Sequence, residues 1–256
     1  MPELPDVEGF RRRLDRHGRG RTIQAIEVLD AGVVRNRDVV GLRRALRHRR
    51  LRRPERRGKW LLAPTDGPTL LFHFGMTGSL ERDGDPHRHD RVVLHLDGGE
   101  LRYRDQRKLQ GLWLADNEEE AAAIIGRQGP DALGLPKSQL RERLAGRRTN
   151  LKTALMDQTV VTGLGNIVTD EVLWRARLHP GRPPGSLAPP EWDRLHRALA
   201  TVLRTSVKEG QVPPRTTWLT GVRDECHPTC PRCQTPLRRT RTGGRTTLWC
   251  PACQPR

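Results

Sequence analysis

The first thing this chain of 256 residues lacks is a long apolar run. No stretch approaches the roughly 20 apolar residues that a membrane-spanning helix needs, and the start of the chain does not show the basic-then-apolar order of a signal peptide. We therefore expect a cytoplasmic protein with no membrane partner. Internal repeats and long low-complexity tracts are also absent, which excludes repeat architectures. At this length, two modest cores are a better expectation than one large core.

Cysteine is absent before position 226, and this excludes a disulfide framework spread over the chain. Four of the five cysteines form two Cys-x2-Cys pairs with sixteen residues between them: Cys230, Cys233, Cys250 and Cys253. This spacing is typical of a structural zinc site with a β-hairpin between the pairs, turning at Thr-Gly-Gly. Four thiolates leave no open position on the metal, so we expect one structural Zn²⁺ that takes no part in catalysis. Cys226 and His227 could substitute as ligands or stay free.

Lysine is also scarce, because only five of the 47 basic residues are Lys and the rest are Arg. Genome base composition can explain part of the preference for Arg over Lys. It does not explain the excess of 47 basic over 30 acidic residues, which gives a net charge of +17 and a pI near 11.2. Such a surface suits a polyanion through counterion release, and nucleic acid is the leading candidate partner.

The pattern of apolar residues changes along the chain and predicts an α+β protein. Short β-type segments are expected at Thr22–Leu29, Trp60–Ala63, Thr69–Phe74, Arg91–Leu96, Glu100–Tyr103 and Gly111–Leu114. Helices are expected at 118–125, 137–145, 150–158, 166–177 and 190–208, with a further helix opening the chain. We therefore expect a β-rich domain over 1–128, a helical domain over 129–222 and a zinc finger over 223–256. The finger is too short and polar to fold on its own apolar core.

The first residues carry the strongest chemical signal. Once Met1 is removed, Pro2 offers an α-amine, whose pKa near 7.7 to 8.0 leaves roughly a few hundred-fold more neutral amine at pH 7 than a lysine. A secondary amine condenses with a sugar aldehyde carbon to a charged iminium without loss of a second proton, and Glu3 is placed to handle protons. On these residues alone, the simpler interpretation is that proline and acidic residues open a helix.

Five features in order resemble the formamidopyrimidine-DNA glycosylase and endonuclease VIII family of base-excision repair enzymes. They are Pro2–Glu8, Arg57–Leu62, His73–Leu80, Leu155–Gln158 leading into Gly163–Ile167, and the zinc finger. The resemblance runs from residue 2 to residue 253. It implies an N-terminal β-sandwich with flanking helices, a helix-two-turn-helix domain and a β-hairpin zinc finger. It also implies a monomeric DNA glycosylase and abasic-site lyase whose partner is double-stranded DNA with damaged bases or abasic sites.

The resemblance also implies roles for single residues. Pro2 matches the amine that attacks C1′ of a flipped nucleotide, Glu3 matches the acid that assists sugar opening, and Lys59 matches a lysine that contacts DNA and assists elimination. The implied DNA contacts are Met76, Arg107, Leu109, Lys152, Asn166 and Arg245. Read without the resemblance, Lys59 would be an ordinary edge charge, Asn166 a helix N-cap, and Met76 and Leu109 core residues.

Two departures from the family pattern bear on the substrate. The chain reads Asp105-Gln-Arg-Lys-Leu-Gln110 where the family shows Asp-Pro-Arg-Arg-Phe-Gly, so Leu109 replaces an aromatic wedge. Segment 211–229 looks shorter than the loop that folds over a flipped oxidised purine. Formamidopyrimidine and 8-oxoguanine are thus favoured only narrowly over oxidised pyrimidines or abasic sites. A non-catalytic protein that binds damaged DNA is an alternative on the same scaffold, and a zinc-ribbon RNA or transcription protein ranks last because it leaves Pro2 and Lys59 unexplained.

Overall fold

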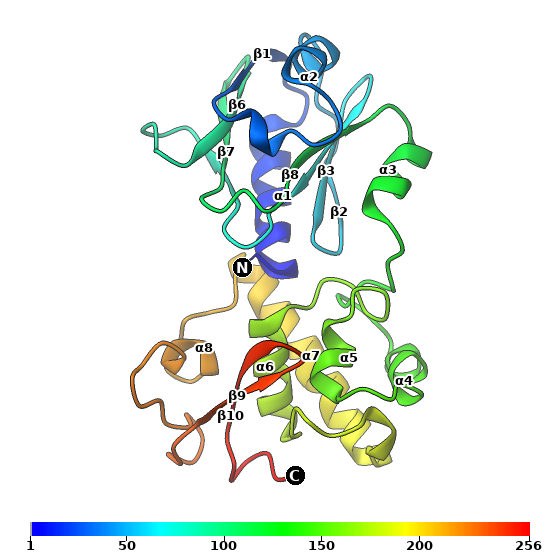
Figure 1. The fold of residues 1–256 in the computed structure, drawn as a ribbon, viewed down its shortest axis with the longest axis vertical. Helices are drawn as coiled ribbons and strands as arrows, with labels where there is room; N and C mark the ends of the chain where they lie inside the picture. Colours follow the sequence, from blue (N-terminus) through cyan, green and yellow to red (C-terminus); the bar gives the residue numbers. More distant parts are fainter. Residues whose placement is uncertain (1) are drawn as a thin grey trace. The chain divides into compact units, whose positions relative to one another are not determined.

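The computed structural model describes residues 2–256, and the chain divides into two compact units, the first ending at Arg127 and the second beginning at Gln128 (Figure 1). Unit 1 holds all strands except those of the last hairpin, and unit 2 holds most helices. None of the helices formed by residues 2–256 has the length and apolar character required to cross a bilayer.

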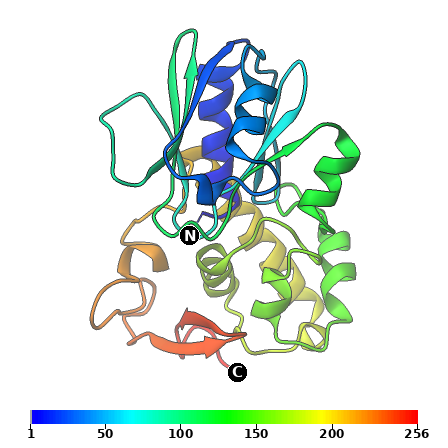
Figure 2. The same ribbon diagram turned by 45° about the horizontal axis from the view of Figure 1, so that its top comes forward.

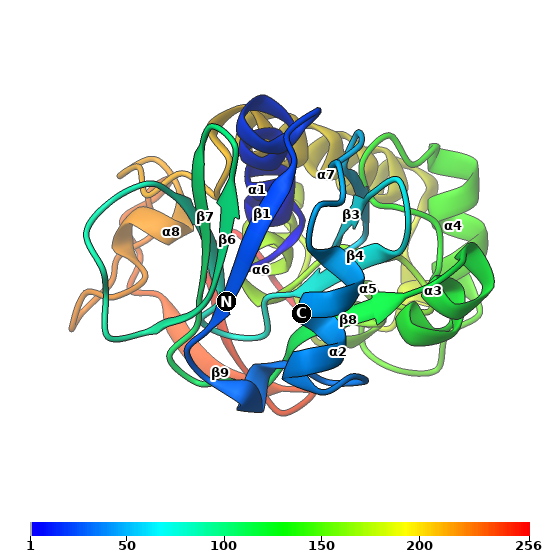
Figure 3. The ribbon, with the colours of Figure 1, turned by 90° about the horizontal axis from the view of Figure 1, so that it is seen from above.

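Unit 1 is built on two antiparallel four-stranded sheets, which lie on two sides of the unit (Figure 3). The first sheet has the order β1 (Ile23–Val28), β6 (Asp90–Leu96), β7 (Gly99–Arg104) and β5 (Ser79–Arg82). The second has the order β2 (Glu55–Arg57), β3 (Trp60–Pro64), β4 (Thr69–His73) and β8 (Gly111–Ala115). One apolar cluster joins both sheets, with Leu94 and Tyr103 from the first, and Phe72 and Leu112 from the second. The expected β-sandwich is confirmed.

Three helices accompany the sandwich: α1 (Leu4–Gly18), α2 (Val39–Leu46) and α3 (Glu118–Ile125). The expected apolar face of the opening helix is present, because Val7 and Leu14 are fully buried and the ring of Phe10 lies 4.5 Å from that of Phe74. Helix α1 therefore packs into the sandwich core, and its first turn holds the start of the chain in place.

Unit 2 consists of α4 (Lys137–Ala145), α5 (Leu151–Met156), α6 (Asn166–Ala176), α7 (Pro189–Glu209), α8 (Leu219–Val222) and the hairpin β9 (Arg238–Thr242) and β10 (Arg245–Trp249). The hairpin lies close to the C-terminus (Figure 2). The finger shares its apolar core with α6, because Trp174 of this helix clusters with Cys230, Leu237, Leu248 and Cys250. The finger thus relies on the helical part for its apolar contacts, as its composition predicted.

Most expected elements are present, and the differences have local causes. The helix expected at 150–158 ends at Met156, because the following residues form a turn held by the Gln158 side chain. Helix α2 was not expected, although Asp38 caps it by accepting a hydrogen bond from the Gly41 N–H at 2.6 Å. Strands β2 and β5 were also missed; they are only three and four residues long and form by pairing with β3 and β7.

Candidate functional site

The start of the chain is fixed by the first turn of α1. Glu3 precedes the helix as its N-cap residue, and its N–H donates to Oδ2 of Asp6 at 2.8 Å. The Glu3 side chain is only 1% exposed, and burial raises the pKa of Asp6. Residue 2 is therefore followed directly by a glutamate that the fold encloses. Removal of Met1, which this chemistry requires, lies outside the described residues.

Lys59 belongs to the turn between β2 and β3. This turn lies at the same end of unit 1 as the start of α1 (Figure 1). This hairpin is attached to α1 by an ion pair in which Nε of Arg56 lies 3.3 Å from Oε2 of Glu8, with both side chains largely buried. Burial, reinforced by the positive charge of Lys59, lowers the pKa of His73 to about 4. His73 is therefore neutral at pH 7, and Lys59 supplies the positive charge beside it.

The loops that carry Met76 and Arg107 are joined by a shared carboxylate. Asp105 is fully buried and accepts a hydrogen bond from the Thr77 hydroxyl. The N–H of Arg107 lies 3.0 Å from the Thr77 hydroxyl oxygen and 3.1 Å from Oδ1 of Asp105. Met76 is half-buried and Arg107 is exposed. Because Asp105 holds both loops, these two side chains have a common rigid support.

Leu109 projects from the second of these loops with 51% of its surface exposed, so its interpretation as a core residue is wrong. The loop beneath it is braced by Arg35, whose Nη2 donates to the carbonyl oxygens of Lys108 at 2.7 Å and Gln110 at 2.6 Å. An exposed apolar side chain on a braced loop is suited to insertion between bases. Sequence reasoning missed Arg35 and Asp105, since only their distant partners reveal their role.

In unit 2, the turn before α6 is shaped by Gln158. Its side-chain amide donates to the carbonyl oxygens of Met156 and Leu164 at 2.8 and 2.9 Å, and its Oε1 accepts the N–H of Gly163 at 3.0 Å. Gly163 has φ +99°, which favours glycine. The N-cap of α6 is Gly165 and Asn166 is the first helical residue, so the N-cap interpretation of Asn166 is corrected. Asn166 thus stands at a helix N-terminus, where anions bind favourably.

Arg245 opens β10 at the tip of the finger hairpin and is exposed. The hairpin turn rests against α5, since a Cβ atom added to Gly243 would lie 2.4 Å from Oγ1 of Thr153. Gly243 also has φ +57°. Only glycine fits this close approach without movement, and the contact sets the position of Arg245 relative to α5.

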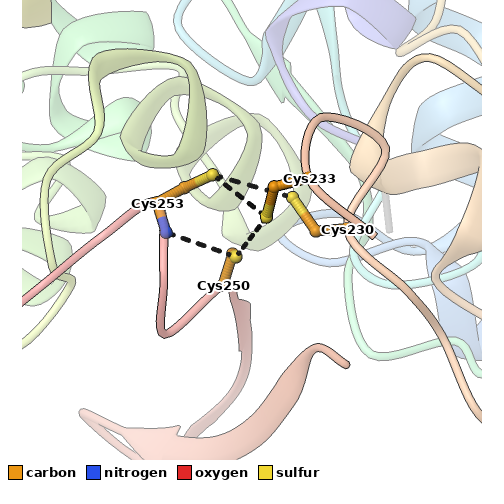
Figure 4. A group of neighbouring side chains, drawn as sticks. All are labelled: Cys230, Cys233, Cys250 and Cys253. Atoms are coloured by element: carbon orange, nitrogen blue, oxygen red, sulfur yellow. Dashed lines mark hydrogen bonds between the residues drawn. The ribbon is translucent and has the colours of Figure 1, made fainter. Parts of the chain in front are cut away.

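The four expected ligand cysteines come together, with all sulfur atoms within 4.8 Å of one another (Figure 4). The Sγ atom of Cys233 lies 3.5 Å from the Sγ atoms of Cys250 and Cys253, and the Sγ atom of Cys230 lies 3.9 Å from that of Cys253. A tetrahedral ion with Zn–S bonds of about 2.3 Å places its sulfur ligands about 3.8 Å apart. The donor set therefore fits a metal ion of this kind. Cys226 is exposed and outside the cluster.

The expected DNA contact of Lys152 is corrected by the structure, because its side chain is completely buried. Its Nζ lies 2.6 Å from Oδ1 of Asp170, and it donates to Oγ1 of Thr247 at 2.8 Å and to the Thr246 carbonyl at 3.2 Å. Asp170 is paired a second time, with Arg223 at 2.9 Å. The lysine charge is thus neutralised inside the protein, where it ties α5 and α6 to the finger hairpin.

Comparisons with known proteins agree with this geometry. The model of the formamidopyrimidine-DNA glycosylase N-terminal domain matches residues 1–112, and that of the H2TH domain of the same glycosylase matches residues 129–216. The formamidopyrimidine-DNA glycosylase of Symbiobacterium thermophilum is 39% identical over 274 residues, covering 100% of this chain and 90% of that protein.

Solved structures are similar over the full length. The Lactococcus lactis Fpg in complex with DNA containing an abasic site has a TM-score of 0.89 and 29% identity, covering 100% of both chains. Two family domains match most of the chain, and relatives are similar from end to end. The chain therefore belongs to the formamidopyrimidine-DNA glycosylase family of enzymes.

Proposed function

We propose that this protein removes oxidised bases from double-stranded DNA and then cuts the strand at the resulting abasic site. The observation that carries the proposal is the placement of Pro2 beside the enclosed Glu3, at the first turn of α1, in a chain that matches the N-terminal domain of this family. The nucleophile is the Pro2 nitrogen after removal of Met1.

The reaction begins when the lone pair of the Pro2 nitrogen forms a bond to C1′ of the damaged nucleotide. The bond between C1′ and the base breaks, and the base leaves with the electron pair and takes up the proton that the Pro2 nitrogen loses. Glu3 in its acid form donates a proton to the sugar ring oxygen as the ring opens, and an iminium remains between Pro2 and C1′. Loss of a C2′ proton then expels the 3′ phosphate by β-elimination, and a second elimination expels the 5′ phosphate.

The other residues bind and orient the DNA. Lys59 contacts the backbone near the reacting sugar and assists elimination. Met76, Arg107 and Leu109 fill the space that the flipped base leaves in the duplex, which offsets part of the few kcal/mol that flipping costs. Asn166 and Arg245 hold phosphates in unit 2. The four clustered cysteines hold one Zn²⁺, which stabilises the finger and leaves no ligand position open for chemistry.

For the substrate, we propose oxidised purines of the formamidopyrimidine and 8-oxoguanine type first. Support comes from the names of the relatives and from a mutant of the Lactococcus lactis Fpg that was solved with DNA containing Fapy-dG and is 29% identical to this chain. The wild-type Lactococcus lactis Fpg has been solved with DNA containing an oxidised pyrimidine, so oxidised pyrimidines are the second candidate. A panel of duplexes with one lesion each, assayed for strand scission, ranks them.

Borohydride trapping tests the nucleophile. Reduction of the iminium should leave a covalent adduct with lesion DNA, and mass analysis should place the sugar on the residue 2 nitrogen. Blocking the terminal amine should abolish trapping, and Pro2→Gly should weaken it. Glu3→Gln should lower base removal strongly, whereas the matched change Glu119→Gln, at an exposed residue of α3, should not. Equal trapping by the wild type, the Pro2→Gly variant and the blocked protein would refute the assignment.

A non-catalytic protein that binds damaged DNA is the second candidate function. It is favoured by Leu109, which stands exposed where the family shows a phenylalanine. In this case Met1 would be retained, and the Pro2 nitrogen would be an amide that cannot attack. Intact mass of the purified protein separates the two functions, since loss of Met1 together with strand scission excludes the binding-only role.

A further inference from the structure

A second concentration of positive charge lies in unit 1, away from the residues described above. Segment 43–53 holds seven arginines in eleven residues, and we call it the arginine segment. Within residues 2–256, none of these seven guanidinium groups has a carboxylate oxygen within 4.0 Å; the arginines are Arg43, Arg44, Arg47, Arg49, Arg50, Arg52 and Arg53. Three of them donate only to carbonyl oxygens, namely those of Ile26, Ala45 and Gly20.

The lack of carboxylate partners in the arginine segment differs from the rest of unit 1, where many arginines are paired with carboxylates. Examples are Arg11 with Glu8, Arg21 with Asp97, Arg37 with Glu120, Arg82 with Asp83 and Arg104 with Asp90. Like charges that stand close together without counter-charges repel one another and destabilise the compact state. The arginine segment is therefore a place where the fold leaves positive charge to be neutralised from outside.

The segment also borders a hollow. An open pocket of about 640 Å³ is lined by Arg50, Arg52 and Arg53 of the segment and by Arg19, which follows α1. Asp66 is the single acidic residue of the lining, and its Oδ1 accepts the backbone N–H of Arg50 at 3.1 Å. Arg52 and Arg53 are both exposed. Guanidinium groups that converge on a hollow can each bind phosphate oxygens with two N–H donors.

The hollow is far from the proposed nucleophile. Pro2 precedes α1 and Arg19 follows it, so the two are separated by the 15 residues of the helix, or about 22 Å at 1.5 Å per residue. The screening length at physiological salt is about 8 Å. Phosphates held near Pro2 are therefore screened from the arginine segment, and its charge needs an anion of its own.

We propose that the arginine segment binds the phosphate backbone of a second DNA segment while the first is held at Pro2. Binding of DNA phosphates by the arginine segment rests only on the arginines and the hollow. Simultaneous binding of another duplex at Pro2 rests on the proposed function. Several phosphates at regular spacing match several arginines around one hollow, and the contacts carry no base recognition. A protein with two such sites can pass from one duplex to another without first becoming free.

The test uses the full chain and two duplexes. The first carries an abasic site and is trapped with borohydride, and the trapping yield reports the proposed function independently. The second is an undamaged, fluorescent duplex added to the trapped complex, and its anisotropy is followed over a range of salt. The variant R52Q/R53Q is compared with R21Q/R82Q, which removes the same charge at exposed arginines that have carboxylate partners.

The trapped wild type should bind the second duplex, and R52Q/R53Q should bind it several-fold more weakly. Loss of two phosphate contacts should reduce the slope of log K against log salt by about 1.8, whereas R21Q/R82Q should leave it unchanged. Trapping of the first duplex should be equal in all three proteins. If trapping fails, the stoichiometry of undamaged duplex is measured on the free protein, and two duplexes per chain still support the second site.

Three results would overturn the proposal. The trapped complex could bind no second duplex, or R52Q/R53Q and R21Q/R82Q could weaken binding equally, which would make the effect one of net charge. The third result is measured by adding inorganic tripolyphosphate at the same phosphate concentration as the second duplex. If it displaces the duplex fully, the segment binds free polyphosphate and not a second DNA.

Discussion

The buried Lys152 allows the sharpest test of the structure, because its two interpretations predict opposite measurements. The perturbation is Lys152→Met, which keeps most of the side-chain length and removes the charge. In the structure this leaves the fully buried Asp170 without its 2.6 Å partner, while the second partner, Arg223, and the backbone N–H of Leu248 at 3.1 Å remain.

The expected cost follows from this geometry. Removing one partner of a buried ion pair typically destabilises a protein by about 3 to 5 kcal/mol. Because Asp170 keeps two further partners, we expect the lower end, about 3 kcal/mol. The matched control is Lys137→Met, which breaks an ion pair of the same 2.6 Å length with Asp193, in which the side chains are 54% and 45% exposed. An exposed pair contributes only about 0 to 1 kcal/mol.

The assay has two readouts, the free energy of unfolding in urea and the salt dependence of DNA binding. Lys152→Met should lower the stability of unit 2. At temperatures where the variant stays folded, the logarithm of its DNA-binding constant K should depend on the logarithm of the salt concentration with the same slope as in the wild type. A lysine that contacts phosphate would instead reduce that slope by about 0.9 with little loss of stability. Observing the second pattern would refute the buried network and restore the direct DNA contact.

Further predictions concern the finger, the interior of unit 2 and the loop of Leu109. Zinc analysis should find one ion per chain. Cys250→Ser or a strong chelator should unfold the finger, measured as faster amide hydrogen exchange in the hairpin, and should weaken DNA binding. An unchanged exchange pattern would argue against a structural ion. Burial raises the pKa of Glu171 to about 7, above its ordinary 4.5, so the folded state retains a proton that the unfolded chain loses first. The contribution of Glu171 to stability should therefore be present in full below about pH 4.5 and fall by about 3 kcal/mol as the pH rises to about 7. In urea unfolding, the stability of the wild type relative to Glu171→Gln should fall by this amount over the same range. Leu109→Ala should weaken binding to an abasic duplex in an anisotropy titration, and Leu109→Phe should retain or strengthen it; equal affinity of all three proteins would show that the side chain does not insert.

Several properties follow from short stretches of sequence. The Cys-x2-Cys pairs predict the four cysteines that come together as candidate metal ligands, because both pairs and the hairpin between them are local. Helices such as α3 and α7 are predicted within one residue at each end, since apolar spacing and capping are read within a few turns. The order of motifs from Pro2 to the finger identifies the family. Short elements such as β2 were missed, because three residues form a strand only when a partner strand is present.

Other properties depend on residues that are distant in the chain, and only the tertiary structure decides them. A lysine is ordinarily a surface residue, and nothing near Lys152 indicates otherwise; its burial depends on Asp170 and Thr247, which lie 18 and 95 residues away. The support beneath Leu109 comes from Arg35. Only the folded chain shows that, within residues 2–256, no guanidinium group of the arginine segment has a carboxylate oxygen within 4.0 Å. Sequence determines which groups are present and how they are spaced, whereas the packing of distant segments determines which charges are neutralised inside and which face the solvent.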